Sequence, residues 1–329
     1  MAFVVDGSEW QVDKFDSPEA FVSALDSLVA RVNAAIERDE MVWIGDDLQS
    51  KPIFENYDLW SLSEAGINLP VELMQELAGW LGRAQFYIDD ENWPAGFDSF
   101  EVVVAGELIE SADVSWVHHC VLVQRPIACL GLMRTGVLQT ESAAGAALVH
   151  WVRDEVGHVG FWRDVIATND SEVQLQRYAA NAFPSLFFGD NVWRGIGDFK
   201  GGYRAVSMKL RRALSVLNDH GRWVFTTPPP NLSPNEPERD EGGSPTNLLM
   251  QQRFTGLGLT VSPEAIEVRL DGTSRRAREL LVKGRTLFCE WHEKFEPHQN
   301  RIYFHPPVEQ SDNKVVIGFF TNHLPLPGD

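Results

Sequence analysis

The chain has 329 residues, with 28 Lys and Arg against 47 Asp and Glu, and its net charge is −19. The hydrophobic fraction of 44% is sufficient for a packed core. No run approaches the ~18 consecutive apolar residues of a membrane-spanning helix, so we expect no membrane association. The opening MAFVVDGSEW lacks the pattern of a secretory signal, which predicts a cytoplasmic protein.

The charge is distributed unevenly along the chain. Strong overall acidity opposes non-specific binding to nucleic acid, which depends on clustered Lys and Arg. Between positions 269 and 305, however, eight Lys and Arg stand against five Asp and Glu. A locally basic segment in an acidic protein is typical of a site for an anionic ligand. The acidic N-terminal region would instead bind a partner or regulate activity.

The first half of the chain predicts an α+β arrangement of helices and antiparallel sheets. Ser17 as N-cap, Pro18 after it and apolar residues at helical spacing predict a helix to about residue 37. A second helix is expected from Pro70. Further along we expect strands at 100–107 and 113–124, a hairpin of 127–132 with 136–141, and a helix over 143–166. These connections are too irregular for repeated βαβ units.

The second half predicts helices, then a linker, then a small C-terminal unit. Residues 172–220 have a helical pattern broken near Pro184, and Gly221 stands where a C-cap glycine is expected. Residues 227–247 are dense in Pro, Gly and acidic residues and have little to bury. We therefore predict an N-terminal region over 1–226, a linker over 227–246 and a C-terminal α+β unit over 247–329.

Two amphipathic strands carry the candidate site. A short basic helix is expected over 274–285, followed by strands at 286–295, 300–306 and 314–320. Alternation places Cys289 and Trp291 on an apolar side of the first strand, so Cys289 is interpreted as packing. The polar sides of the first two strands would form one solvent face, with these members: Glu290, His292, Lys294, Arg301, Tyr303 and His305. His298 falls in the loop between the strands.

This set of side chains suits metal-independent cleavage of RNA. That reaction needs a base for the 2′-hydroxyl, an acid for the leaving oxygen and cations for the developing negative charge. His or Glu can act as the base, and His or Tyr as the acid. Arg301 and Lys294 would hold the phosphate, because Arg is suited to bidentate contact. The alternative interpretation is a solvated sheet face with cross-strand ion pairs.

The last 80 or so residues also resemble the RelE/HigB family of ribonuclease toxins. The matching stretches are CEWHEKF, NRIYF and KVVIGFF, followed by TNHLP. The resemblance implies helices followed by a twisted antiparallel sheet, and an RNA-cleaving toxin or anti-phage protein. It would make Lys294 and Arg301 phosphate-binding residues and Tyr303 a base-stacking or proton-transfer residue. His292 or His323 would be the acid or base.

A second candidate site lies in the first half. The stretch VHWVRDEVGHVGFW (149–162) would place His150, Asp154 and His158 on one helical face, where they could bind a metal ion. His118 and His119 could complete such a site. An Asp–His hydrogen-bonded stripe on a half-exposed helix is the alternative.

Three functions therefore remain open from the sequence. The first is a metal-independent endoribonuclease, and the second is a non-catalytic protein whose C-terminal sheet is an interaction surface. The third is a metal-dependent enzyme that uses the helix at 150–158. No GxSxG, P-loop or strand-linked GxGxxG motif occurs, and no cofactor is expected.

Overall fold

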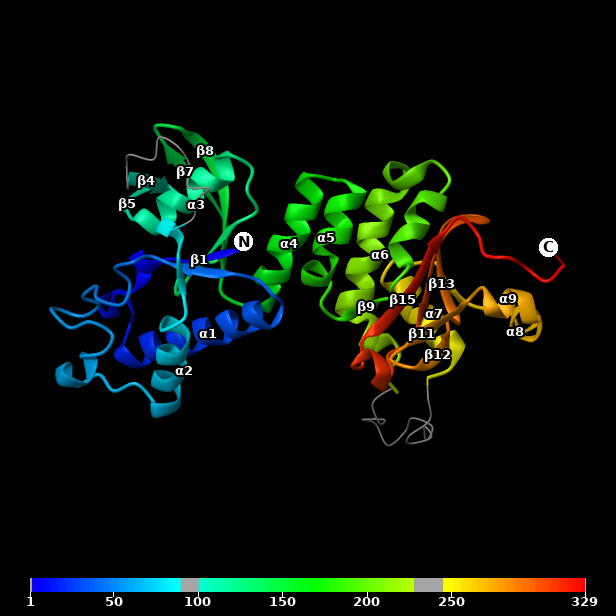
Figure 1. The fold of residues 1–329 in the computed structure, drawn as a ribbon, viewed down its shortest axis with the longest axis horizontal. Coiled ribbons are helices and arrows are strands. Elements are labelled where there is room, and N and C mark those ends of the chain that lie inside the picture. Colours follow the sequence, from blue (N-terminus) through cyan, green and yellow to red (C-terminus); the bar gives the residue numbers. More distant parts are fainter. Residues whose placement is uncertain (1, 90–100, 228–244, 329) are drawn as a thin grey trace, which may run out of the picture. The chain divides into compact units, whose positions relative to one another are not determined.

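A computed structural model describes residues 2–89, 101–227 and 245–328 (Figure 1). The chain divides into two compact units, Met1–Val165 and Ile166–Asp329, called here the first and second units. The division lies well before the predicted linker at 227–246, most of which falls outside the described residues. Helices that the sequence analysis assigned to the N-terminal region therefore belong with the C-terminal sheet.

The first unit is built on an eight-stranded mixed sheet in the order β3-β2-β1-β6-β8-β7-β4-β5. The strands from β3 to β8 in this order are parallel, and β7, β4 and β5 extend the sheet by antiparallel pairing. Their bounds are β1 Phe3–Val5, β2 Val42–Ile44, β3 Gln85–Phe86, β4 Glu101–Val104, β5 Glu107–Glu110, β6 Ala128–Leu130, β7 Gly136–Ser142 and β8 Gly145–Val152.

The helices of the first unit are α1 Pro18–Glu37, α2 Val71–Leu81, α3 Ala112–Leu122 and α4 Glu155–Thr168. Ser17 caps α1 by accepting a hydrogen bond from the Ala20 amide, as the sequence predicted. Helices α1 and α2 connect parallel neighbours β1, β2 and β3. The chain therefore forms two successive βαβ units here, and the expectation that the connections of this half are too irregular for repeated βαβ units is wrong.

In two segments of the first unit, the prediction exchanges helix and strand. In the predicted strand at 113–124, residues 113–122 lie in α3 and not in a strand. This helix is buried on most sides, including Trp116, Val117 and Cys120, so its sequence lacks a polar face and resembles a buried strand. Residues 145–152 form β8, not a helix, because they pair with both β6 and β7. The predicted hairpin of 127–132 with 136–141 is also wrong, since β6 and β7 each pair with β8.

The second unit is built on a five-stranded sheet in the order β10-β13-β14-β15-β9, with a separate hairpin β11-β12. The strands are β9 Leu186–Phe188, β10 Val261–Pro263, β11 Glu279–Val282, β12 Arg285–Phe288, β13 Trp291–Glu296, β14 Gln299–His305 and β15 Val315–Thr321. The helices are α5 Glu172–Ala182, α6 Gly202–Val224, α7 Asn247–Gly256, α8 Ile266–Leu270 and α9 Gly272–Arg276. The predicted strands at 300–306 and 314–320 match β14 and β15.

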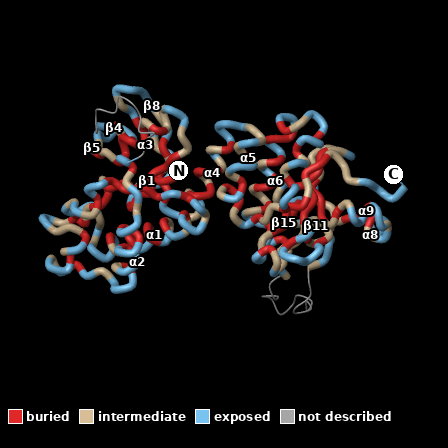
Figure 2. The backbone as a smooth tube through the Cα atoms, in the orientation of Figure 1, coloured by how far each residue is buried: buried red, intermediate tan, exposed pale blue. Residues whose placement is uncertain are grey.

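Aromatic packing fixes one face of this sheet against helices. Trp291 and Phe304, which are cross-strand partners, pack on Phe225 and Phe254 with ring centroids 5.8–6.5 Å apart. Gly221 lies within α6 and does not cap it; a Cβ there would lie 2.6 Å from Val315 Cγ2. The glycine therefore permits close approach of α6 to β15. Figure 2 shows the strands of this sheet as largely buried.

The α+β class predicted from the sequence is confirmed. Across the described ranges, no helix combines the length and apolar character needed to cross a membrane.

Candidate functional site

The sheet of the second unit brings four predicted site residues together. In the β13–β14 pairing, His292 lies opposite Tyr303 and Lys294 lies opposite Arg301. Because Trp291 and Phe304 point to the helices, these four side chains lie on the other face. The predicted facing of the two strands is therefore confirmed. Lys294 and Arg301 are two cations in direct cross-strand register, an arrangement that is unfavourable without an anion nearby.

This polar face is buried, which corrects the prediction that it is exposed to solvent. Tyr303 is 0% exposed, His292 is 5% exposed and Arg301 is 7% exposed. The alternation of the strands predicted which side chains share a face, but it gave no information on what covers that face. The cover consists of residues from outside the hairpin.

Glu264 and Arg278 are two of these covering residues. Glu264 Oε1 lies 2.8 Å from His292 Nδ1, and Glu264 Oε2 lies 3.1 Å from Arg278 Nε. The Arg278 guanidinium also stacks over the Tyr303 ring, 5.4 Å from its centroid. Glu264 follows β10, which pairs with β13, and Arg278 lies between α9 and β11.

The electrostatics of the pair favour a neutral imidazole beside a charged carboxylate. Burial, together with the charges of Arg301 and Lys294, lowers the pKa of His292, although contact with Glu264 opposes the shift. Burial alone would raise the pKa of Glu264, but contacts with His292 and Arg278 outweigh it, and the pKa is lowered. A charged Glu264 favours the tautomer of His292 with its proton on Nδ1, which leaves the lone pair on Nε2.

Several buried nitrogens of this cluster have no hydrogen-bond partner among the described residues. They are both ring nitrogens of His292, Nε and Nη2 of Arg278, and Nε of Arg301. Glu264 Oε1 is also without one, so its 2.8 Å approach to His292 is an ion-pair contact and not an aligned hydrogen bond. Arg278, Lys294 and Arg301 contribute three cations to the cluster, whereas Glu264 contributes one carboxylate. Buried polar groups are normally satisfied, so this surplus of donors and positive charge favours binding of an anion with several acceptor oxygens.

The segment after β15 lies across the cluster. The Leu324 amide donates to Tyr303 Oη at 3.4 Å, and Arg278 Nη1 donates to the Pro325 carbonyl at 2.9 Å. Arg301 Nη1 donates to the same Tyr303 oxygen at 3.3 Å. Residues 324–325 therefore close the site through backbone groups.

Three other predicted site residues do not join this cluster. Glu290 precedes β13 and forms an ion pair with Arg269 at 3.2 Å. His305 Nδ1 lies 2.7 Å from the Pro306 carbonyl, and His323 Nδ1 lies 2.6 Å from the Leu324 carbonyl. Each histidine thus has one ring nitrogen engaged by the backbone of the next residue. Cys289 is fully buried, in agreement with its predicted packing role.

The predicted metal site at 150–158 is not formed. His150 lies in β8, Asp154 precedes α4 and caps it at Gly157, and His158 lies inside α4. His150 Nε2 is 3.4 Å from Asp164, whereas His158 Nε2 is 2.6 Å from Glu40. The prediction from the i, i+4, i+8 spacing is wrong because β8 ends at Val152, between His150 and Asp154, so the three residues do not share one helix. His118 bonds to Thr140 and Ser142 instead.

A buried carboxylate cluster in the first unit was missed by the sequence analysis. Asp6 directly follows β1 and accepts hydrogen bonds from Trp151 Nε1 at 2.8 Å and Arg134 Nη1 at 3.0 Å. Glu9 accepts from the backbone amides of Leu132, Met133 and Arg134 at 2.6–2.8 Å. These contacts join the carboxyl ends of β1 and β6, where the strand order reverses and α/β sheets commonly bind ligands.

Asp113 completes this cluster from the first turn of α3. Its Oδ2 accepts from the Gly7 amide at 2.9 Å, and a Cβ at Gly7 or Gly45 would lie 2.6–2.7 Å from its carboxylate oxygens. Burial and the neighbouring charges of Asp6 and Asp47 raise the pKa of Asp113 to about 7, although hydrogen bonds from Tyr87 and Gly7 oppose the shift. The signal in the sequence was a pair of short apolar runs, FVV and VWI, followed by Asp-Gly and Gly-Asp-Asp.

Neither cluster has the geometry of a metal centre. Across the part of the chain that the structure describes, no group of three or more His, Cys, Asp or Glu side chains could hold a metal ion. Comparisons with protein-family models, with curated proteins and with solved structures find no match for this chain.

Proposed function

We propose that the second unit cleaves RNA without a metal ion, with His292 as the general base. The observation that carries this proposal is the Glu264–His292 pair. Glu264 Oε1 lies 2.8 Å from Nδ1 of the imidazole in an ion-pair contact, and neither ring nitrogen has an aligned hydrogen-bond partner among the described residues. A base oriented by a carboxylate, with its second nitrogen free for substrate, is the arrangement of acid–base sites.

The proposed reaction begins at the ribose 2′-hydroxyl. His292 Nε2 takes the hydroxyl proton while the 2′-oxygen bonds to phosphorus. The bond from phosphorus to the 5′-oxygen breaks, and that oxygen takes a proton from the Tyr303 hydroxyl. The products are a 2′,3′-cyclic phosphate and a 5′-hydroxyl end, and solvent returns the proton from the imidazolium to Tyr303.

The three cations would stabilise the charge that develops on phosphorus oxygens. Arg301 and Lys294 lie in register on adjacent strands, and Arg278 lies over the Tyr303 ring. Such donors contribute most where water is excluded, and this face is buried. The choice of RNA as the substrate rests on the resemblance of CEWHEKF and NRIYF to ribonuclease toxins.

Access to this site requires residues 324–325 to move. Their contacts with the site are two hydrogen bonds, to Tyr303 and from Arg278. Net hydrogen bonds of this kind contribute only about 0.5–1.5 kcal/mol each. A chain that ends at Asn322 should therefore admit RNA more readily than the complete chain.

The test is cleavage of a single-stranded RNA in the presence of EDTA. We expect cyclic-phosphate products from the wild-type chain and faster cleavage by the chain ending at Asn322. His292→Ala should lower the rate by ~10²–10⁴-fold, the usual contribution of a general base. His298→Asn is the matched control, because it changes an exposed histidine of the same hairpin at a positive-φ position that Asn tolerates.

Three results would contradict the proposal. One is the absence of cleavage by both the complete and the shortened chain, and another is activity lost only when EDTA is added. The third is cleavage of a substrate with 2′-deoxyribose at the scissile position, since the proposed attack needs the 2′-hydroxyl.

The burial of the cluster favours a second candidate function, binding of a small phosphate-bearing ligand without cleavage. Side chains that are 0–7% exposed suit a small anion better than a polymer. Under this alternative, inorganic phosphate would stabilise the fold while RNA remained intact in every sample.

A further inference from the structure

A pocket in the first unit lies apart from both charged clusters. Its volume is about 250 Å³, just below the range of about 300–1,000 Å³ for ligand pockets, so it suits only a small ligand. It is formed where the last turn of α1, the start of β2 and the last turn of α2 meet. The lining residues are Ile36, Glu40, Met41, Val42, Trp80, Arg83, Ala84 and Gln85.

The walls of this pocket are mainly apolar and partly open to solvent. Ile36 is 51% exposed and Met41 is 37% exposed, whereas Trp80 is buried. An indole and a thioether in the lining of one pocket suit contact with an aromatic ring, because sulfur and ring faces attract aromatic partners. The volume admits one ring with a short chain.

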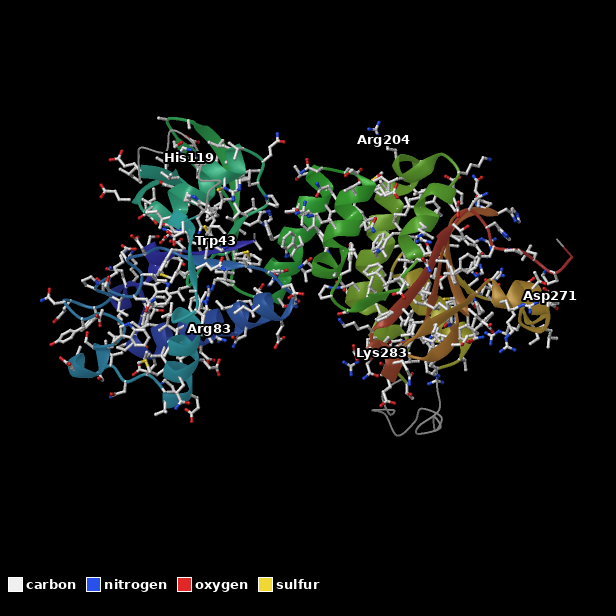
Figure 3. The ribbon with its side chains drawn as sticks, viewed as in Figure 1. Trp43, Arg83, His119, Arg204, Asp271 and Lys283 are labelled. Atoms are coloured by element: carbon white, nitrogen blue, oxygen red, sulfur yellow. The ribbon has the colours of Figure 1, made fainter. Side chains whose placement is uncertain are left out.

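The two charged side chains that line the pocket differ in whether they already pair with another side chain. Glu40 is bonded to His158 Nε2 at 2.6 Å, so its charge is committed within the fold. Arg83, labelled in Figure 3, donates from Nε to the Gly79 carbonyl at 2.8 Å. Within the described part of the chain, this exposed guanidinium has no carboxylate partner. The pocket therefore combines apolar walls with the guanidinium of Arg83, while the carboxylate of Glu40 is held by His158.

We infer that this pocket binds a small aromatic carboxylate. The ring would pack between Trp80 and Met41, and the carboxylate would pair with the guanidinium of Arg83. An arginine fork binds a carboxylate through two parallel hydrogen bonds, which fixes the orientation of the ligand. The site is independent of the proposed RNA cleavage, because every residue involved belongs to the first unit.

The test is isothermal titration calorimetry with 3-phenylpropanoate and its uncharged analogue 3-phenylpropan-1-ol. We expect one carboxylate bound per chain and about tenfold weaker binding of the alcohol. Arg83→Gln should weaken carboxylate binding about tenfold, and Ala84→Phe should abolish binding of both probes by filling the pocket. Arg153→Gln, which removes an exposed arginine elsewhere in the same unit, should leave binding unchanged.

The inference is overturned if 3-phenylpropanoate fails to bind the wild-type chain. Equal binding of the alcohol and the carboxylate also overturns it, as does unchanged binding to the Arg83→Gln chain. A thermal unfolding curve for each variant establishes that the protein is folded, and Arg83 is exposed, so its replacement leaves the core intact.

Discussion

The two units each bury a cluster of charged side chains against a sheet, but they satisfy those charges differently. In the first unit the buried charges are carboxylates, and each oxygen of Asp6 and Glu9 pairs with backbone amides, Trp151 or Arg134. Asp113 Oδ1 is the one carboxylate oxygen of this cluster without a hydrogen-bond partner among the described residues. In the cluster of the second unit the charged side chains are mainly cations, namely Arg278, Lys294 and Arg301 against Glu264. There, nitrogens of Arg278, Arg301 and His292 lack hydrogen-bond partners among the described residues.

This difference separates a charge cluster that holds a fold from one that suits a ligand. Charges that are fully hydrogen-bonded repay the cost of leaving water, and removing one partner leaves the others unpaired. Buried charges without hydrogen-bond partners lower the free energy of unfolding, and proteins tolerate that loss at functional sites. We therefore expect substitutions in the first cluster to lower the free energy of unfolding, and substitutions in the second to affect binding.

Glu9→Ala gives the largest expected effect. The change removes the acceptor of three backbone amides and one partner of Arg134, all at least partly buried. We expect the free energy of unfolding to fall by about 3–5 kcal/mol, measured by urea denaturation. Glu37→Ala, at an exposed position, should change it by less than about 0.5 kcal/mol. A loss below about 1 kcal/mol for Glu9→Ala would show that this cluster does not hold the fold as argued.

Asp113→Asn has the next largest expected effect and is visible in the pH dependence. The pKa of Asp113 is about 7 in the folded chain against an ordinary value of 3.8. Between pH 4 and 7 the folded state therefore retains a proton that the unfolded state has lost, and stability falls as pH rises through this window. The slope from one such group reaches about 1.4 kcal/mol per pH unit.

Urea denaturation of both chains between pH 4 and 8 measures this effect. Glu9 and Glu293 also have raised pKa values and contribute the same sign in both chains, so the difference isolates Asp113. The Asp113→Asn chain should lose less stability between pH 4 and 7. Identical slopes for the two chains would contradict the raised pKa of Asp113.

Local sequence patterns correctly predicted helices and strands that have one apolar face and one polar face. Ser17, Pro18 and the apolar stripe after them predicted α1, and alternation placed His292 and Tyr303 on one face of paired strands. The same reasoning failed for α3 and β8, where burial on most sides or Ala-rich sequence removed the periodic signal. Contacts with segments far away in the sequence determined the structure of α3 and β8, and a single sequence does not show those contacts.

For a related reason, strand patterns could not predict which residues contact the side chains of the candidate site. Glu264 and Arg278 approach His292 and Tyr303 through the arrangement of β10 and α9, and Leu324 returns across the sheet after β15. The sequence placed the cations of the hairpin correctly but assigned them to solvent. Burial of a polar face depends on which other segments cover it, and no local periodicity contains that information.

Arg301→Met has the smallest expected effect on stability and tests the contrast most directly. The change removes the cation opposite Lys294 while keeping most of the side-chain volume, and it costs one 3.3 Å hydrogen bond to Tyr303. We expect the free energy of unfolding to change by less than about 1 kcal/mol, with an increase from relief of like-charge repulsion.

Inorganic phosphate should stabilise the wild-type chain by RT ln(1 + [L]/Kd) relative to chloride at equal ionic strength. That gain should disappear in the Arg301→Met chain and persist in a Lys209→Met chain, whose cation lies near Glu296 outside the cluster. Equal gains in all three chains would mean that phosphate acts on the whole surface, and the incomplete charges of the second unit would then not form an anion site.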